Sequence, residues 1–453
     1  MSNSAKEATA SVRANRIRRS GAQRTSILYL LVLSVAPTFF REHLKLEGAE
    51  PNQTTRTLLA RKDLTEAKRV LKSAVDKGTI AGFVAQVMQR GKPQLAEAYG
   101  EADVHRPMKM DTIFRIASMT KPITSAAIMM LVEEHKVSLD DPLSKFIPEF
   151  GESRVAGEST GETVKLVRPI TIRDLLTHTS GIAYGLNPPE KLKAAFQDAQ
   201  LADGLNSVDR SLAENMRALA HVPLLHQPGE AVTYGMNTDV LGRVVEVASG
   251  QGFDQFLKDR IFIPLKMVDT GFFVPEGKQD RLAAVYRPLK NSGATSVAKV
   301  DHDPETVGSI TYSASRVCTP PNYLSGGAGL VSTVADYSRF LTMLQRGGEL
   351  DSVRLLKPNT IKTMTSNQIG GLPGPNLKHG DKFGFGFAVV TQPGFTASVG
   401  TYSWGGFYFT YFWVDPELEL VAVLMTQLYP WGDSNLWFDF QKAVYAGLRE
   451  ASE

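Results

Sequence analysis

A serine and a lysine three residues apart open a long apolar stretch in the first third of this chain. Ser118-Met119-Thr120-Lys121 leads through Pro122 into a run rich in Ala, Met and Leu. Side chains at this spacing share one face of a helix, and proline is tolerated in a first turn. An amine held in an apolar pocket loses part of its proton affinity and can draw a proton from a neighbouring hydroxyl. The pattern therefore predicts that Ser118 is a nucleophile.

The spacing alone is weak evidence, because Ser-x-x-Lys arises about once or twice by chance in a chain of ordinary composition. A second copy is present at Ser296-Val297-Ala298-Lys299. That copy lies in a polar stretch with no helical pattern to order it, whereas Ser118 begins a helix. The free N–H groups and the positive dipole end of that helix would also face an oxyanion beside Ser118.

Further motifs follow in a fixed order along the chain. They are Leu175-Leu176-Thr177-His178-Thr179-Ser180-Gly181, Tyr234 in a turn-rich loop, Gly326-Gly327-Ala328-Gly329-Leu330 and Trp404-Gly405-Gly406. With Ser118-x-x-Lys121 they resemble the serine β-lactamase and penicillin-binding-protein superfamily. The resemblance is strongest to its class C-like branch, which includes the family VIII carboxylesterases, and it covers roughly residues 60–447.

The departures from that family pattern point to the substrate. Where the β-lactamases carry an asparagine two residues after the tyrosine, this chain has Met236, and Asn237 comes one residue late. Where they carry a lysine that attracts the lactam carboxylate, it has Trp404. Burying a carboxylate without a partner costs several kcal/mol. An uncharged ester is therefore the expected substrate, with a β-lactamase, a D-alanyl-D-alanine carboxypeptidase or an acyl transferase as the alternatives.

The resemblance implies a mechanism with named roles. Ser118 would attack a short-to-medium acyl ester and form an acyl-enzyme, while Lys121 and Tyr234 share the proton transfers as a coupled pair. Which of the two is the base stays open. The backbone N–H groups of Ser118 and Phe407 would form the oxyanion hole. The expected substrate-binding residues are Trp404, Gly405, Gly406, Met236 and Asn237, and the aromatic residues Tyr402, Phe407 and Tyr408 are expected to line an apolar pocket. No metal or organic cofactor is required.

Rival sites have weaker support. Gly157-Glu158-Ser159-Thr160-Gly161 matches the nucleophile elbow of α/β-hydrolases, but it follows a polar loop instead of the buried strand that the elbow requires. His178 is interpreted as a hydrogen-bonded structural residue. The eight histidines and the single cysteine show no metal-binding spacing.

Charge is concentrated in the N-terminal segment. Residues 1–45 hold eight basic and two acidic side chains, so the rest of a chain of net charge +3 carries −3. No basic stripe remains for nucleic acid. An apolar stretch at residues 27–36 is too short to span a bilayer and resembles a secretory signal. Export or membrane association through residues 1–45 is therefore weakly favoured over a cytoplasmic location, and neither a firm membrane partner nor an oligomeric state is indicated.

The expected architecture is of the α+β type, with a β-lactamase-like fold over residues 59–450 after a targeting or disordered segment at 1–58. Strands are expected near residues 81–89, 94–99, 383–390, 407–414 and 418–425, with helices near both ends of the domain. The family fold implies one antiparallel sheet flanked by those terminal helices. The sheet lobe would comprise about 59–117 and 326–450, and a mainly helical lobe about 118–325, with the active site in the cleft between them.

Overall fold

The computed structural model describes residues 63–449, apart from residues 160, 292–293, 375–380, 394–395 and 432–434. All of these belong to one compact unit. The expected N-terminal targeting segment, residues 1–58, lies outside the described residues.

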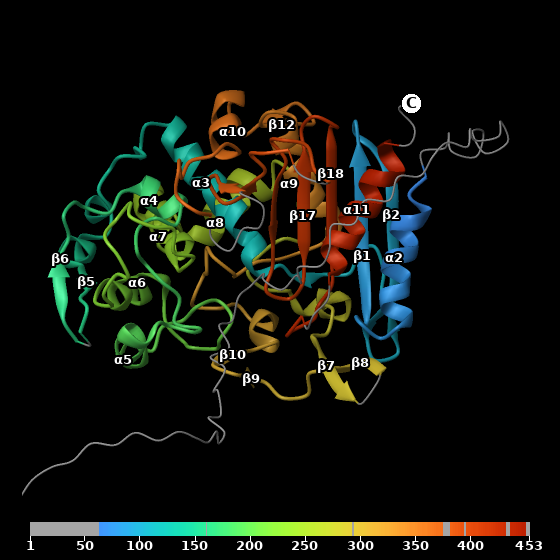
Figure 1. Ribbon diagram of the computed structural model, residues 1–453, viewed down its shortest axis with the longest axis horizontal. Coiled ribbons are helices and arrows are strands. Elements are labelled where there is room, and N and C mark those ends of the chain that lie inside the picture. Colours follow the sequence, from blue (N-terminus) through green and yellow to red (C-terminus); the bar gives the residue numbers. More distant parts are fainter. Residues whose placement is uncertain are drawn as a thin grey trace, which may run out of the picture. The chain divides into compact units, whose positions relative to one another are not determined.

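One antiparallel sheet is the main framework of the fold (Figure 1). Its eight strands, in spatial order, are β14 (Lys382–Phe383), β15 (Ala388–Val389), β16 (Tyr402–Gly405), β17 (Tyr411–Asp415), β18 (Leu420–Met425), β1 (Gly82–Gln89), β2 (Lys92–Asp103) and β3 (Arg106–Pro107). The C-terminal strand β18 thus pairs with β1, with Val84 opposite Met425. The predicted sheet built from both ends of the domain is confirmed. The strand expected at 407–414 begins only at Tyr411, and the one expected at 383–390 is divided into β14 and β15.

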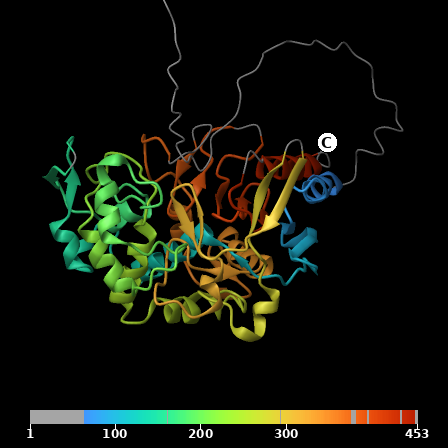
Figure 2. The same ribbon diagram turned by 90° about the horizontal axis from the view of Figure 1, so that it is seen from below.

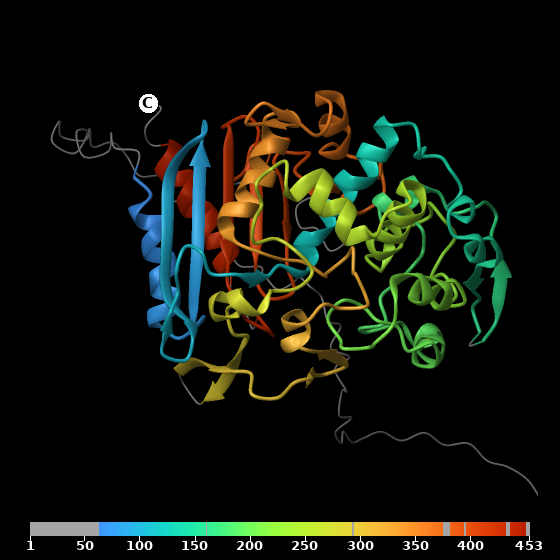
Figure 3. The same ribbon diagram turned by 180° about the vertical axis from the view of Figure 1, so that it is seen from behind.

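Helices cover both faces of the sheet, as the alternation of side chains along β1 requires. Phe83, Ala85 and Val87 pack in one apolar cluster with α2 (Thr65–Asp76) and α11 (Leu436–Arg449). Val84 packs in the other cluster, with α9 (Val334–Gln345) on the opposite face (Figure 3). The terminal helices therefore flank the sheet as predicted.

A second group of helices lies at the far end of this unit from α2 (Figures 1 and 2). These are α3 (Thr120–Glu133), α4 (Ile172–Leu176), α5 (Glu190–Ala199), α6 (Leu212–Ala220), α7 (Asn237–Ser249) and α8 (Phe253–Leu257), and α10 (Pro358–Met364) follows later in the chain. The described chain also has small two-stranded sheets: β4 (Phe114–Arg115) with β11 (Val331–Ser332), β5 (Arg154–Ala156) with β6 (Thr163–Lys165), β7 (Tyr286–Asn291) with β8 (Ala294–Lys299), β9 (Glu305–Val307) with β10 (Ile310–Tyr312), and β12 (Glu349–Leu350) with β13 (Val353–Arg354).

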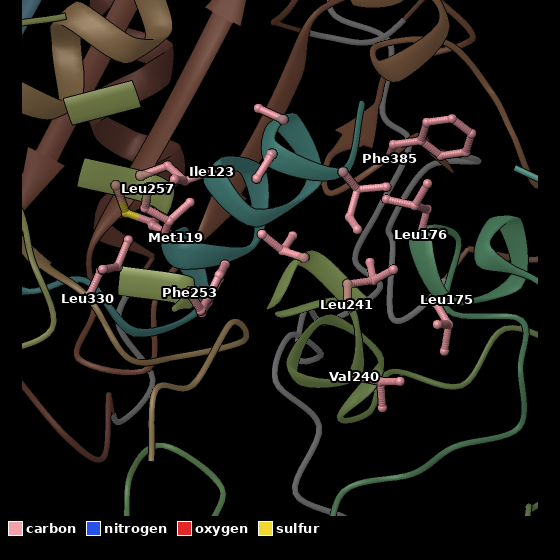
Figure 4. Close-up of a cluster of buried hydrophobic side chains, with 14 of the residues drawn as sticks. Met119, Ile123, Leu175, Leu176, Val240, Leu241, Phe253, Leu257, Leu330 and Phe385 are labelled. Atoms are coloured by element: carbon pink, nitrogen blue, oxygen red, sulfur yellow. The ribbon is translucent and has the colours of Figure 1, made fainter. Parts of the chain in front are cut away.

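The helix α3 is the buried centre of this arrangement. Twelve of its fourteen residues are buried, so its apolar side chains face neighbours in every direction. Figure 4 shows Met119 and Ile123 at its start among side chains of α4, α7 and α8, including Leu175, Leu241 and Leu257. A helix held on all sides keeps the residues at its N-terminus in fixed positions.

Candidate active site

Ser118 lies in a short 3-10 helix, Ala117–Met119, that leads directly into α3. The backbone of Ala117 has a φ of +42°, in the left-handed region that non-glycine residues rarely adopt. Ala117 is buried while the Ser118 side chain is partly exposed. The strained turn therefore presents the hydroxyl at the surface of an otherwise closed core.

Two groups contact the Ser118 hydroxyl. The phenol of Tyr234 donates a hydrogen bond of 2.9 Å to Ser118 Oγ. The Lys121 ammonium donates another of 3.3 Å to the same oxygen. The structure thus brings the three predicted catalytic residues together, although Tyr234 is 116 positions from Ser118 in the chain.

The Lys121 side chain is fully buried. Its ammonium also donates to the phenol oxygen of Tyr184 at 3.0 Å and to the carbonyl of Gly327 at 2.8 Å. It lies 4.6 Å from the centre of the Tyr234 ring, a favourable place for a cation. Burial raises the pKa of the Tyr184 phenol well above its usual range, and the negative charges that Tyr234, Asp239 and Asp203 can carry raise it further. Tyr184 therefore serves Lys121 as a neutral partner.

Tyr184 and the Gly327 carbonyl were absent from the sequence-based prediction. Gly327 lies in the predicted glycine-rich motif, but its carbonyl carries no sequence signal. Tyr184 follows the Leu175–Gly181 motif by three positions, and a tyrosine at that distance has no pattern of its own. Both reach Lys121 only through the packing of separate segments.

The Tyr234 ring is held by aromatic neighbours. It lies 4.9 Å from the His178 ring, 5.6 Å from Tyr184 and 5.4 Å from Trp404, measured between ring centres. The loop before it is tied to the segment after α4, because Thr233 N–H donates to the His178 carbonyl at 2.8 Å. The position of the phenol is therefore set by several segments at once.

A polar hydrogen-bond network next to Tyr234 includes Asn237, which the sequence predicted to contact the substrate. Asn237 Nδ2 donates to His178 Nδ1 at 2.9 Å and to the Ile182 carbonyl at 3.3 Å, while Asn237 Oδ1 accepts from Ser180 Oγ. Met236 and Asn237 are both fully buried. The first turn of α7 turns both side chains into the core, and a substrate contact at these two residues stays a prediction.

His178 is the structural residue that its sequence context predicted. Its Nδ1 must be unprotonated to accept from an amide, so the ring is neutral. Burial, together with the nearby charge of Lys121, holds the pKa of His178 well below its usual value. The ring orients Tyr234 and Asn237 and takes no part in a Ser-His pair.

The sheet edge approaches Ser118 through Trp404-Gly405-Gly406-Phe407. A Cβ atom on Gly406 would collide with the carbonyl oxygen of Ile116 and with Thr410 Oγ1, so only glycine lets this edge come so close to the turn that carries Ser118. In the described part of the chain the Phe407 N–H has no acceptor. It is thus available beside Ser118, as an oxyanion hole requires.

Ala117, which precedes the nucleophile, belongs to an apolar cluster beside the site. Its members with partly exposed side chains are Leu186, Val307, Ala314, Ala328, Phe407 and Trp431. Two of the three aromatic residues expected to line a pocket do not. Tyr408 is buried inside this cluster, in the turn after β16, and Tyr402 is buried against Phe387, at 5.1 Å between ring centres. Neighbouring residues therefore cover both side chains.

The rival serines lie in unsuitable places. Ser159 is exposed in the turn between β5 and β6, with no helix after it. Ser296 and Lys299 both lie in β8, where a spacing of three puts the side chains on opposite faces, and Lys299 pairs with Asp103. Among the described residues, no cluster of three potential metal ligands and no helix with the length and apolarity of a membrane span is found.

Comparison with known proteins gives a consistent result. The family model described as Beta-lactamase matches residues 67–445. Esterase EstB of Burkholderia gladioli is 33% identical over 83% of this chain and 94% of its own length. An uncharacterised protein of Mycobacterium tuberculosis, MT1414, is 36% identical over 80% of this chain and 89% of its own. The solved structure of EstCE1, described as a hydrolase with promiscuous acyltransferase activity, aligns with a TM-score of 0.73 at 29% identity, covering 87% of this chain and all of its own.

Proposed function

Because this chain belongs to the Beta-lactamase family, we propose that it is a serine carboxylesterase whose acyl-enzyme forms on Ser118. The observation that carries the proposal is the position of the Ser118 hydroxyl, which accepts hydrogen bonds from both the Tyr234 phenol at 2.9 Å and the Lys121 ammonium at 3.3 Å. A nucleophile within reach of its proton acceptor is the geometric requirement for covalent catalysis.

The reaction proceeds in two halves. One proton must first leave the Lys121–Tyr234 pair. Ser118 Oγ then attacks the ester carbonyl and its proton passes to the deprotonated member of the pair, and the C–O bond to the alcohol breaks as the pair returns that proton to the leaving oxygen. Water then attacks the acyl-enzyme, gives its proton to the pair, and the proton returns to Ser118 Oγ as the acid leaves. The negative carbonyl oxygen of each intermediate accepts from the N–H groups of Ser118 and Phe407.

The walls of the site support an uncharged acyl group. The Trp404 ring packs between Tyr234, at 5.4 Å, and Phe383, at 5.2 Å, where a lactamase would offer a cation. Leu186, Phe407 and Trp431 add partly exposed apolar surface. Such surface favours short-to-medium acyl chains by about 25 cal/mol for each Å² covered, whereas a carboxylate would lose hydration there.

The first test is hydrolysis of p-nitrophenyl butyrate by the wild type and by Ser118→Ala, with Ser159→Ala as the matched control. Esterase activity that disappears in Ser118→Ala and persists in Ser159→Ala is the expected result. Activity that survives in Ser118→Ala would refute the proposal. A chromogenic cephalosporin measured in parallel separates the alternatives, since a lactam preferred over the ester would make the protein a β-lactamase.

Acyl transfer is the second candidate, favoured by the likeness to EstCE1, whose description includes promiscuous acyltransferase activity. The same acyl-enzyme would then pass its acyl group to an alcohol. Adding a primary alcohol to the p-nitrophenyl butyrate assay distinguishes the two outcomes, because transfer produces a new butyrate ester in place of free butyric acid.

A further inference from the structure

A buried carboxylate lies behind the carbonyl that receives Lys121. Asp239, in the first turn of α7, is fully buried. Its Oδ1 accepts from the phenol of Tyr323 at 2.9 Å and from Ser325 Oγ at 2.5 Å. Its Oδ2 has no hydrogen bond of ordinary geometry, although the Gly327 N–H is close enough to favour the charged form. The carboxylate thus faces Gly327 with Oδ2, the oxygen that accepts no hydrogen bond of ordinary geometry.

Gly327 separates Asp239 from Lys121. A Cβ atom on Gly327 would collide with Asp239 Oδ2 and would lie 3.0 Å from the Tyr184 phenol oxygen. The carbonyl of the same residue accepts the Lys121 ammonium at 2.8 Å. One residue without a side chain therefore has the carboxylate against its Cα and the ammonium against its carbonyl.

The turn that contains Gly327 is fixed from both sides. Ser325 Oγ, which donates to Asp239, accepts from the Ala328 N–H at 2.9 Å. On the other side, Thr124 of α3 donates to the Gly326 carbonyl at 2.8 Å. Asp239 is consequently the anchor on the α7 side for the segment that places an acceptor beside Lys121.

Charge gives Asp239 a second connection to Lys121. The three acceptors of the ammonium are neutral, and no carboxylate in the described part of the chain lies within 4 Å of it. Burial raises the pKa of Asp239, while the hydrogen bond from Ser325 and the charge of Lys121 oppose that effect. The two opposite charges stabilise each other across Gly327.

We propose that Asp239 is a positioning residue that holds the Gly327 carbonyl toward Lys121 and supplies the countercharge for the ammonium during acylation. When the Ser118 proton resides on Lys121 Nζ, the site carries one more positive charge at a buried position, and a fixed negative charge nearby lowers the free energy of that state. This inference rests on the proposed role of Lys121.

Other titratable groups share these surroundings and must be considered in any pH profile. Tyr184, Tyr234 and His178 face Lys121. Tyr323, Asp203 and Arg316 act on Asp239 through a hydrogen bond or through charge. None of them is altered by the substitution proposed next.

The decisive variant is Asp239→Asn, which keeps Oδ1 for Tyr323 and Ser325, removes the charge and puts an NH2 group in the place of Oδ2 beside Gly327. Without the negative charge of Asp239, the ammonium form of Lys121 is less stable relative to the neutral amine. The limb of the kcat/KM profile that reports the Lys121–Tyr234 pair should therefore move by about one pH unit toward lower pH. At the wild-type optimum, kcat for p-nitrophenyl butyrate should fall about tenfold with KM unchanged, because Asp239 does not touch the ester.

Asp415→Asn is the matched control, since Asp415 is equally buried and bonds Tyr445 at 2.8 Å in another part of the fold. It should lower thermal stability without moving the limb. An Asp239→Asn profile that coincides with the wild-type profile would overturn the inference.

If that variant does not fold, Ser325→Ala replaces it. This change removes the hydroxyl that links Asp239 to the turn, and an unaltered kcat would also overturn the inference. Full activity in Ser118→Ala would instead refute the esterase mechanism itself.

Discussion

The phenol of Tyr234 donates a hydrogen bond of 2.9 Å to Ser118 Oγ while its ring lies 4.6 Å from the Lys121 ammonium. A single side chain thus contacts both the nucleophile and the amine. This position lets the phenol exchange a proton with Ser118 directly while the ring covers the ammonium, and it depends on packing against His178 and Trp404.

Tyr234→Phe keeps this packing and removes the phenol. We expect kcat/KM for p-nitrophenyl butyrate to fall between about a hundredfold and ten-thousandfold, the range for loss of a general acid or base. Tyr99→Phe is the control, because it removes a phenol that bonds Asp76 at the same distance of 2.9 Å on β2. Equal activities in the two variants would exclude Tyr234 from the proton transfers.

Asn237→Ala tests whether that residue supports the core or contacts the substrate. The change leaves His178 Nδ1 and Ser180 Oγ without their buried partner, so the free energy of unfolding should fall by about 2–3 kcal/mol in urea denaturation. KM for small esters should stay within a factor of two, since Asn237 has no exposed surface. A raised KM at unchanged stability would restore the substrate contact that the sequence suggested.

Gly406→Ala tests the close approach of the sheet edge to the Ser118 turn. The added methyl collides with the Ile116 carbonyl and displaces the Phe407 N–H, so kcat should fall by about two to three powers of ten, as on loss of an oxyanion donor. Gly371→Ala is the matched control, because a Cβ atom there meets nothing within 4 Å. The same loss in both variants would point to general destabilisation.

Asp203 gives a pH dependence of stability. Burial raises its pKa from 3.8 to about 6, so the folded state holds a proton that the unfolded state has released. This stabilisation is complete below pH 3.8 and is lost as the pH rises through 6, amounting to about 3 kcal/mol. Asp203→Asn has no such loss. Its stability relative to the wild type should therefore improve between pH 4.5 and pH 7.5 in chemical denaturation, and a difference that is constant with pH would contradict the assignment.

The sequence predicts best the parts of the site that depend on short spacings. Ser118 and Lys121 share the start of one helix, so their contact is visible in the spacing, and the sheet follows from strands at both ends of the domain. Tyr184 contacts Lys121, and Asp239 lies behind Gly327, only through packing between α3, α7 and the loops, for which the sequence carries no local signal.

Other expectations followed the local sequence where packing decides the position of a side chain. Met236 and Asn237 were aligned with a substrate contact by counting from Tyr234, but they enter a helix whose first turn is buried. Tyr402 and Tyr408 were expected to line the pocket, but Tyr402 is buried against Phe387 and Tyr408 is buried in the turn after β16. In both cases tertiary packing determined the outcome.

The complete burial of Lys121 has a practical consequence. Reagents that modify amines from solution meet the surface lysines, and the amine beside Ser118 has no exposed area to offer them. Lys68, Lys145 and Lys193, for example, have side chains at least 44% exposed. The protein can therefore be coupled through surface amines to a solid support while the amine of its reaction centre stays unmodified.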